Sequence, residues 1–260
     1  MRYILSFAFL SFIFVSTHVL ADDAQRIGLE IATEADRRDQ GFADLTANIT
    51  MIIKQDGGQQ QRDLKFSALE LSDDGEKRLF VFHHPADIKG TAVLNYSHIR
   101  GDDDQWIFLP AFKRVKRISS ANKSRPFVGS EFYYEDLVSI ELPKYHYLYL
   151  GEEEIHGQPC FKVQFTPTYE NSGYSRQIVY LDKQYYRVQK VEFFDPQNAL
   201  LKTLTANGYH QYLGKYWRPD VLHMINHRNN RETIMQWKNI KMKNGLSRQD
   251  FTVVALKRIR

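Results

Sequence analysis

Hydrophobic positions first recur with the period of a helix. In residues 23–38 the apolar side chains Ile27, Ile31 and Ala35 fall at four-residue spacing, and charged residues occupy most positions between them. This spacing places the apolar side chains on one face of a helix. We therefore expect an amphipathic helix at the beginning of the folded chain.

After Gly41 the hydrophobic period drops to two and stays there. Short segments of alternating or largely apolar residues, separated by turn residues such as Asp56-Gly57-Gly58, predict an antiparallel meander, and no βαβ alternation is visible. We therefore expect a mainly β fold with a single domain over residues 22–260. The predicted strands are 49–53, 64–69, 79–83, 91–98, 105–109, 145–150, 160–166, 176–181, 186–194, 199–209, 217–226 and 233–241.

The segment from Pro110 to Leu142 interrupts this pattern, because it is too long and too irregular for a hairpin turn. One interpretation is a solvated loop with a short helix that crosses the sheet. The other is a lid or docking surface, over Pro110–Asp136, for an anionic partner such as lipid headgroups or an acidic protein face. The candidate lid and docking residues are Lys113, Arg114, Lys116, Arg117, Phe132 and Tyr134.

The beginning of the chain is typical of an export signal. Arg2 precedes the apolar run Ile4–Val15, and Val19-Leu20-Ala21 supplies a cleavage site. The run is shorter than the roughly 20 apolar residues of a membrane anchor. The single cysteine, Cys160, does not follow the cleavage site, so we expect no lipid anchor. The sequence predicts cleavage after Ala21 and a periplasmic protein.

Charge and motifs argue against several classes of protein. The net charge of +4 at pH 7 is too small to indicate a nucleic-acid partner. The sequence contains no nucleophile elbow, P-loop or dinucleotide-binding motif. Ser130, His146 and Asp136 are the residues that a hydrolase would draw on, but their spacing gives no reason to expect that they meet. We expect no catalytic residues, no metal site and no cofactor.

Aromatic residues are abundant, with 17 Phe, 15 Tyr and 3 Trp. One sheet and one helix cannot easily cover so much apolar surface. The sheet must curl, and it then either fills itself with side chains or leaves a lined cavity. The residues that we expect to line such a cavity are Trp106, Phe108, Phe161, Val163, Phe165, Tyr180 and Trp217.

Three blocks of sequence, Phe82–Thr91, Trp106–Ile118 and Gly129–Leu137, carry a family resemblance. In this order and spacing they resemble the outer-membrane lipoprotein-sorting-like family, distant relatives of the periplasmic carrier LolA. The resemblance implies an incomplete, half-open barrel: a curved antiparallel sheet with an N-terminal helix and a mid-chain helical or loop plug, around an apolar cavity.

The same resemblance implies a carrier of lipid, acyl-chain or lipoprotein cargo that works with an RND-type inner-membrane exporter. We expect such a carrier to be a monomer that contacts the membrane transiently. The alternative is an accessory subunit that docks on the exporter and carries nothing. Its interior would be filled with side chains, whereas a carrier's would be hollow.

Overall fold

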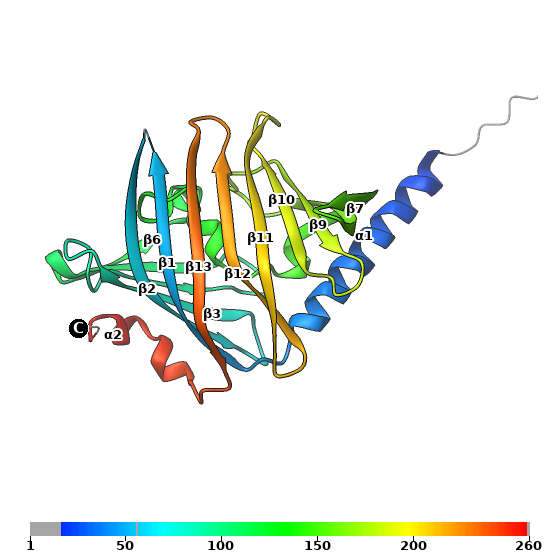
Figure 1. The fold of residues 1–260 in the computed structure, drawn as a ribbon. Helices are drawn as coiled ribbons and strands as arrows, with labels where there is room; N and C mark the ends of the chain where they lie inside the picture. The colour runs from blue at the N-terminus through cyan, green and yellow to red at the C-terminus, as the bar shows by residue number, and fades with distance from the viewer. Residues whose placement is uncertain (1–16, 56, 259–260) are drawn as a thin grey trace, which may run out of the picture.

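The computed structural model describes residues 17–55 and 57–258, in which all strands join one sheet of 13 antiparallel strands (Figure 1). The sheet order is β6-β5-β4-β3-β2-β1-β13-β12-β11-β10-β9-β8-β7. The strands are β1 (Asp44–Gln55), β2 (Gly58–Glu70), β3 (Glu76–His84), β4 (Ala92–Tyr96), β5 (Asp104–Leu109), β6 (Arg114–Ile118), β7 (Tyr145–Ile155), β8 (Gln158–Pro167), β9 (Arg176–Asp182), β10 (Val188–Phe194), β11 (Leu200–Tyr212), β12 (Tyr216–Asn226) and β13 (Arg231–Met242).

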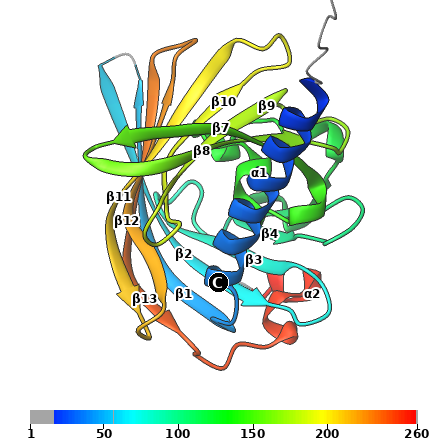
Figure 2. The ribbon, with the colours of Figure 1, turned by 90° about the vertical axis from the view of Figure 1, so that its right-hand side faces the viewer.

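Two meanders of consecutive strands meet in the middle of this sheet, where β1 pairs with β13 and Met51 lies opposite Met235. The outer strands β6 and β7 do not pair with each other among the described residues, so the sheet curves without closing (Figure 2). The predictions of a mainly β fold and of an incomplete antiparallel barrel are therefore confirmed.

The predicted helix over residues 23–38 is confirmed within α1 (Thr17–Asp39), which crosses the open side of the sheet and packs on β7. Gly28 permits this packing, because a Cβ atom there would lie 2.8 Å from the backbone nitrogen of Tyr149. Ile31 and Ala32 are buried on the side of the helix that faces the core. The predicted signal peptide falls largely outside the described residues, and cleavage after Ala21 stays a prediction.

The expectation that residues 110–142 contain no regular strand is wrong for β6, which pairs with β5 and places Arg117 opposite Trp106. Its basic side chains are exposed, because β6 is the outermost strand of the sheet. Edge strands of this kind often carry charges that discourage pairing with other chains. An edge strand rich in Lys and Arg lacks the apolar alternation by which the other strands are identified.

The rest of the segment, residues 119–144, turns back into the concave side of the sheet, and we call it the plug. It contains four short 3-10 helices: η2 (Ser120–Asn122), η3 (Phe127–Gly129), η4 (Tyr134–Leu137) and η5 (Leu142–Lys144). Phe127 is fully buried, with its ring centroid 5.5 Å from those of both Phe80 and Phe82. The plug therefore fills one end of the half-barrel.

Buried polar contacts attach the plug to the sheet. Lys202 on β11 is fully buried, and its Nζ donates to Asp136 Oδ2 at 2.7 Å and to the carbonyl of Glu131 at 3.0 Å. Asn226 donates to the Glu131 carboxylate at 2.6 Å, and the Glu131 backbone N–H donates to Thr233 at 2.9 Å. Charged groups at this depth are stable only because each has a partner.

We predict that Lys202→Met lowers the free energy of unfolding by about 3–5 kcal/mol, because it leaves the Asp136 carboxylate buried without its cation. Chemical denaturation measures the change. The matched control is Lys190→Met, which removes a lysine from a partly exposed pair with Glu192 and should cost about 0–1 kcal/mol. Equal losses in the two variants would contradict the anchoring role of Lys202.

Candidate functional site

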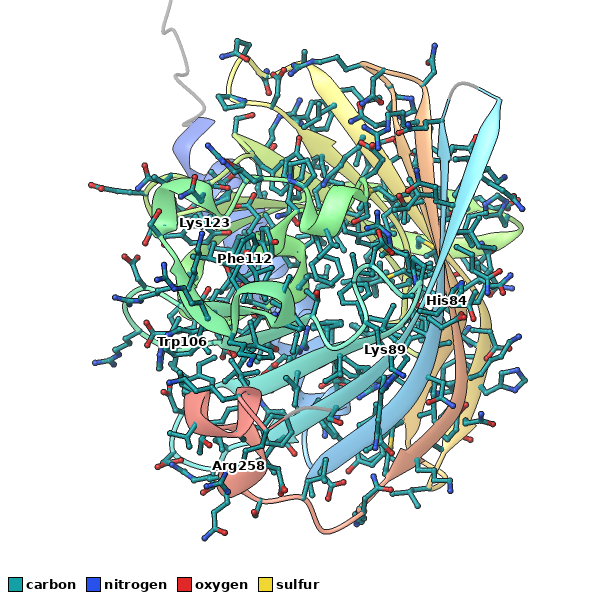
Figure 3. All side chains as sticks on the ribbon, turned by 90° about the vertical axis from the view of Figure 1, so that its left-hand side faces the viewer. His84, Lys89, Trp106, Phe112, Lys123 and Arg258 are labelled. Carbon is teal, nitrogen blue, oxygen red and sulfur yellow. The ribbon has the colours of Figure 1, made fainter. Side chains whose placement is uncertain are left out.

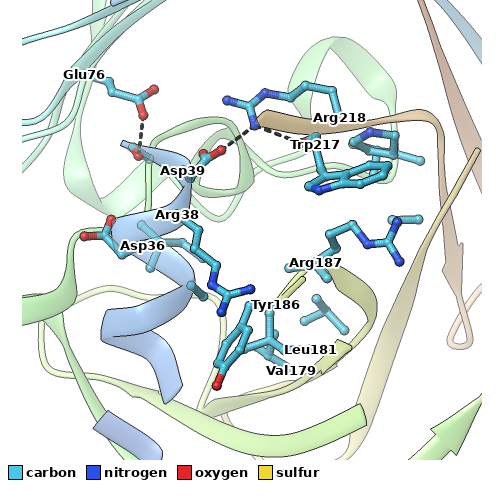
Figure 4. Close-up of a pocket in the computed structure, with 18 of the residues that line it drawn as sticks. Asp36, Arg38, Asp39, Glu76, Val179, Leu181, Tyr186, Arg187, Trp217 and Arg218 are labelled. Carbon is cyan, nitrogen blue, oxygen red and sulfur yellow. Dashed lines mark hydrogen bonds and ion pairs between the residues drawn. The ribbon is translucent and has the colours of Figure 1, made fainter. Parts of the chain in front are cut away.

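A cavity of about 820 Å³ lies on the concave side of the sheet, between the C-terminal half of α1, the plug and the strands that surround them (Figure 4). This volume is in the range of pockets that hold small ligands. The chemical character of the lining side chains changes from one end of the cavity to the other. Strand β9 runs along this direction and therefore serves to define the two ends.

On β9 the residues Gln177, Val179 and Leu181 alternate with outward-facing neighbours, and all three line the cavity. Because a strand rises about 3.3 Å per residue, Gln177 lies about 13 Å from Leu181 along the strand. The turn that follows β9 supplies rim residues such as Arg187. The cavity therefore runs from a mouth near this turn to an inner end beside Gln177 and the plug.

The middle of the cavity is apolar. Strands β10, β11 and β12 contribute aliphatic side chains to its wall, and β2 and β13 contribute Phe66 and Trp237, whose ring centroids lie 5.0 Å apart. The aliphatic wall residues include Val179, Val191, Leu204, Leu222 and Met224. Such a surface favours contact with hydrocarbon, because it presents few polar groups to the ligand.

Three arginines from separate elements surround the mouth, as Figure 4 shows. Arg38 on α1 lies 4.3 Å from the ring centroid of Tyr186 and donates to the carbonyl of Gln184 at 2.9 Å. Arg187 stacks 4.7 Å from the Trp217 ring.

The third of these arginines, Arg218, donates to Asp39 at the end of α1. Lys215 in the β11–β12 turn donates to the carbonyl of Gln40 at 2.6 Å. Together with the Arg38 contact, these bonds hold the end of α1 against the β9–β10 and β11–β12 turns. Most of the groups are exposed or half-buried, so each bond contributes little to stability.

Acidic groups lie at both ends of the cavity. Asp36 is half-buried at the rim, where burial and the nearby Glu141 and Asp39 carboxylates raise its pKa to about 6. Glu135 on the plug lines the inner end, and its carboxylate accepts from the backbone N–H of Gly173 at 3.0 Å. Burial, followed by the charge of Asp136, raises the pKa of Glu135 to about 7.

The residues predicted to line the cavity do not all do so. Phe165 and Trp217 line it. Phe161 and Val163 belong to the same concave core but are not among the lining residues: Val163 is fully buried, and Phe161 packs on Tyr186 at 5.4 Å between ring centroids.

The remaining three predicted lining residues lie on the convex face, which corrects the expectation. Trp106 and Phe108 pack in a cluster with Phe251 and Leu256 from the C-terminal segment, which contains η6 (Arg248–Phe251) and α2 (Val253–Leu256). Tyr180 packs in a separate outer cluster with the buried Cys160, Ile155 and Ile178. Alternation separates the two faces of a strand, but it does not say which face is covered by which part of the chain.

The predicted lid residues fall into two groups. Phe132 is buried in the plug and lines the cavity, and Tyr134 packs edge-on against Phe127 with centroids 5.8 Å apart. The four basic residues from Lys113 to Arg117 are exposed on or beside β6, and they do not line the cavity. The predicted lid is therefore an inner plug joined to an outer basic edge.

Sequence reasoning missed most of the mouth. Its residues come from the end of α1, from Tyr185–Arg187 in the β9–β10 turn, and from Gly214–Arg218, which covers the end of the β11–β12 turn and the start of β12. The sequence signal that could have identified the mouth is that an Arg follows two aromatic residues in each of these two segments. The hydrolase candidates also separate: Asp136 pairs with Lys202, Ser130 is fully buried, and His146 is exposed on β7.

Comparisons with known proteins agree with this architecture. A family model described as that of an uncharacterized protein matches residues 74–258. A solved structure described as an outer membrane lipoprotein-sorting protein domain from Vibrio parahaemolyticus is 48% identical, with a TM-score of 0.89 over 90% of this chain and 100% of that one. The chain belongs to the outer-membrane lipoprotein-sorting-like family.

Other solved structures extend this family's fold to more distant proteins. A DUF1329 family protein from Desulfovibrio piger is 29% identical, with a TM-score of 0.85 over 90% of this chain and 99% of that one. A LolA superfamily protein from Nitrosomonas europaea is 19% identical, with a TM-score of 0.70 over 88% of this chain and 98% of that one, so the fold is LolA-like. No curated protein matches the chain.

Two further observations concern only the described part of the chain. None of its helices has the length and apolar character needed to cross a membrane. Its His, Cys, Asp and Glu residues form no group of three or more with the arrangement of a metal site.

The unaltered protein should lose stability between about pH 4.5 and 7, because Glu135 must give up its proton there. We predict that Glu135→Gln removes this loss, since the amide does not titrate. The folded-state pKa of about 7 lies above the usual value of 4.5, so the folded state holds this proton more tightly than the unfolded chain. The contribution of this carboxyl group to stability is therefore fully present below pH 4.5, and it is lost as the pH rises from 4.5 through 7. Melting temperatures of both proteins across this range measure the effect, and unchanged pH dependence would contradict it.

Proposed function

We propose that this protein is a periplasmic carrier that binds a lipid, an acyl chain or a lipid-modified protein in its cavity and shuttles it between membranes. The observation that carries the proposal is the apolar cavity of about 820 Å³, left open on the concave side of a lipoprotein-sorting-like fold. Cleavage of the signal peptide after Ala21, which would release the domain into the periplasm, is part of the same proposal.

The energetics of transfer favour a carrier of this design. Exposing hydrocarbon to water costs about 0.8 kcal/mol per CH₂, so a chain of about 16 carbons faces a cost of about 12 kcal/mol. A wall of aliphatic and aromatic side chains offsets most of that cost. Nonspecific apolar contact also allows release, because few directional bonds must break when the cargo leaves.

The route of the cargo follows from the contacts at the mouth. The end of α1 is held by bonds from Arg38, Lys215 and Arg218, and these bonds are near the surface. In contrast, the plug is held by buried charges. Local opening draws on the least stable contacts first. Cargo therefore passes between the end of α1 and the two neighbouring turns, while the plug stays in place.

The proposed partner is an RND-type inner-membrane exporter, and the basic edge is the surface that would meet it. Lys113, Arg114 and Lys116 are exposed, and no ion pair of theirs is recorded within residues 17–55 and 57–258. Phe112 beside them is 69% exposed, and Figure 3 labels it on the same side of the molecule as Lys89. Exposed cations around an exposed aromatic ring favour contact with an acidic surface.

We predict that Leu222→Glu weakens the binding of a dansyl-labelled fatty acid at least tenfold, because it places a carboxylate in the apolar wall beside the ligand. Fluorescence titration of the purified protein measures the dissociation constant. The matched control is Leu200→Glu, since Leu200 is 42% exposed and does not line the cavity. Its affinity should equal that of the unaltered protein.

The carrier proposal fails if the unaltered protein neither binds this probe nor carries a co-purified lipid in native mass spectrometry. If the protein still docks on the exporter in that case, the accessory-subunit alternative holds instead.

We predict that Lys113→Glu, Arg114→Glu and Lys116→Glu together abolish co-purification with the exporter from detergent-solubilised inner membranes, because they reverse the charge of the basic edge. The control carries the same three charge reversals at Lys238, Lys241 and Lys243, which are exposed near the end of β13. It should co-purify normally. Loss of co-purification in both variants would show an effect of net charge and contradict a specific docking edge.

A further inference from the structure

The inner end of the cavity holds a buried polar side chain without a protein partner. Gln177 is only 7% exposed and lines the cavity, and no hydrogen bond to its side-chain amide is recorded within the described residues. Its amide atoms are not among the fully enclosed polar atoms that lack a partner, so they are open to the cavity. A cargo that covers this amide without bonding to it would leave it unpaired and would lose binding energy.

The strand register shows how isolated this amide is. Gln177 lies between Phe165 on β8 and Phe193 on β10, and Lys202 follows Phe193 in the same row across the sheet. The polar members of the row beyond it are satisfied, since Lys202 pairs with Asp136 and Asn226 bonds to Glu131. Among the polar members of this row, Gln177 is the one that lines the cavity, and it does so between Phe165 and Phe193.

A second polar group lies at the same end of the cavity. The carboxyl group of Glu135 lines it, and its recorded partners, Gly173 and Ser172, occupy only part of the capacity of its two oxygens. The amide of Gln177 offers both a donor and an acceptor. The cavity is therefore polar at its inner end, apolar in its middle and charged at its mouth.

We propose that Gln177 forms a subsite for a hydroxyl or carbonyl group at the inserted end of the cargo, so that the preferred cargo is an amphiphile with polar groups at both ends of its hydrocarbon. This inference rests on the proposed carrier function. It deepens that function, because a cargo that ends in plain hydrocarbon would bury the amide against methylene groups and leave it unpaired.

Water can satisfy the amide in the empty cavity, and the choice of cargo follows from what displaces that water. A ligand hydroxyl reproduces the lost hydrogen bonds, whereas a methyl group does not. Sites that hydrogen-bond a ligand group discriminate strongly against the analogue that lacks it. The subsite therefore acts as a specificity determinant at the far end from the charged mouth.

The test compares ω-hydroxy fatty acids of graded chain length with the plain fatty acids of equal length, each displacing the dansyl-labelled fatty acid. We expect the protein to bind at least one ω-hydroxy acid tenfold or more tightly than its plain counterpart. Gln177→Met, which keeps the length of the side chain and removes the amide, should abolish this preference while it retains or improves binding of the plain acid.

Two further variants keep the test decisive. Gln177→Leu provides a second removal of the amide, so that one misfolded variant does not leave the question open. Gln164→Leu is the matched control, because Gln164 lies on the neighbouring strand and bonds Thr166 outside the cavity; it should keep the preference.

Equal binding of both acids at every chain length would overturn the subsite and leave the carrier standing. A preference that survives in both Gln177 variants would also overturn the subsite. Binding of neither acid nor the dansyl probe would overturn the carrier and the subsite together.

Discussion

The buried ion pair between Lys202 and Asp136 decides where the concave side of the sheet is filled and where it stays open. Lys202 projects from the C-terminal meander, and Asp136 belongs to the plug that follows β6. The rings of Tyr133 and Tyr174 surround the ammonium group, at 3.7 and 5.1 Å from their centroids, and exclude water from it. Because a lone buried charge is far less stable than a pair, the plug cannot leave without a large loss of stability.

This constraint divides the half-barrel into two unequal ends. At the plugged end, phenylalanines from β3 and the plug form a packed core. At the other end, the sheet keeps its apolar concave face, but only α1 and two turns stand over it. The end of α1 is held there by the Arg218–Asp39 pair and by the bonds from Arg38 and Lys215 to backbone carbonyls, which lie near the surface. The same fold thus combines an end that is fixed by buried charges with an end that is covered through contacts near the surface.

Local periodicity identified the helix and the strands of this fold, but it did not identify which strands pair or which segment covers each face of the sheet. The spacing of Ile27, Ile31 and Ala35 identified α1, and period-two alternation identified twelve of the strands. Alternation could not reveal that β1 pairs with β13, because that pairing joins segments about 190 residues apart. Nor could it tell that Trp106 and Phe108 face the C-terminal segment, since the covering residues lie at the far end of the chain. The cavity depends on such long-range placements, so only Phe165 and Trp217 were found among the predicted lining residues.

The order of elements along the chain also relates the outer surface to the cavity. The basic edge strand β6 ends at Ile118, and the plug begins at the next residue. Within the plug, Phe132, Glu135 and Asp136 line the cavity, and Gln177 on β9 lines it as well. The segment that carries the cavity's inner wall therefore follows β6 directly along the chain. Because Lys202 holds that segment from the opposite meander, the plug is fixed on one side by the pairing of β6 with β5 and on the other by the buried ion pair.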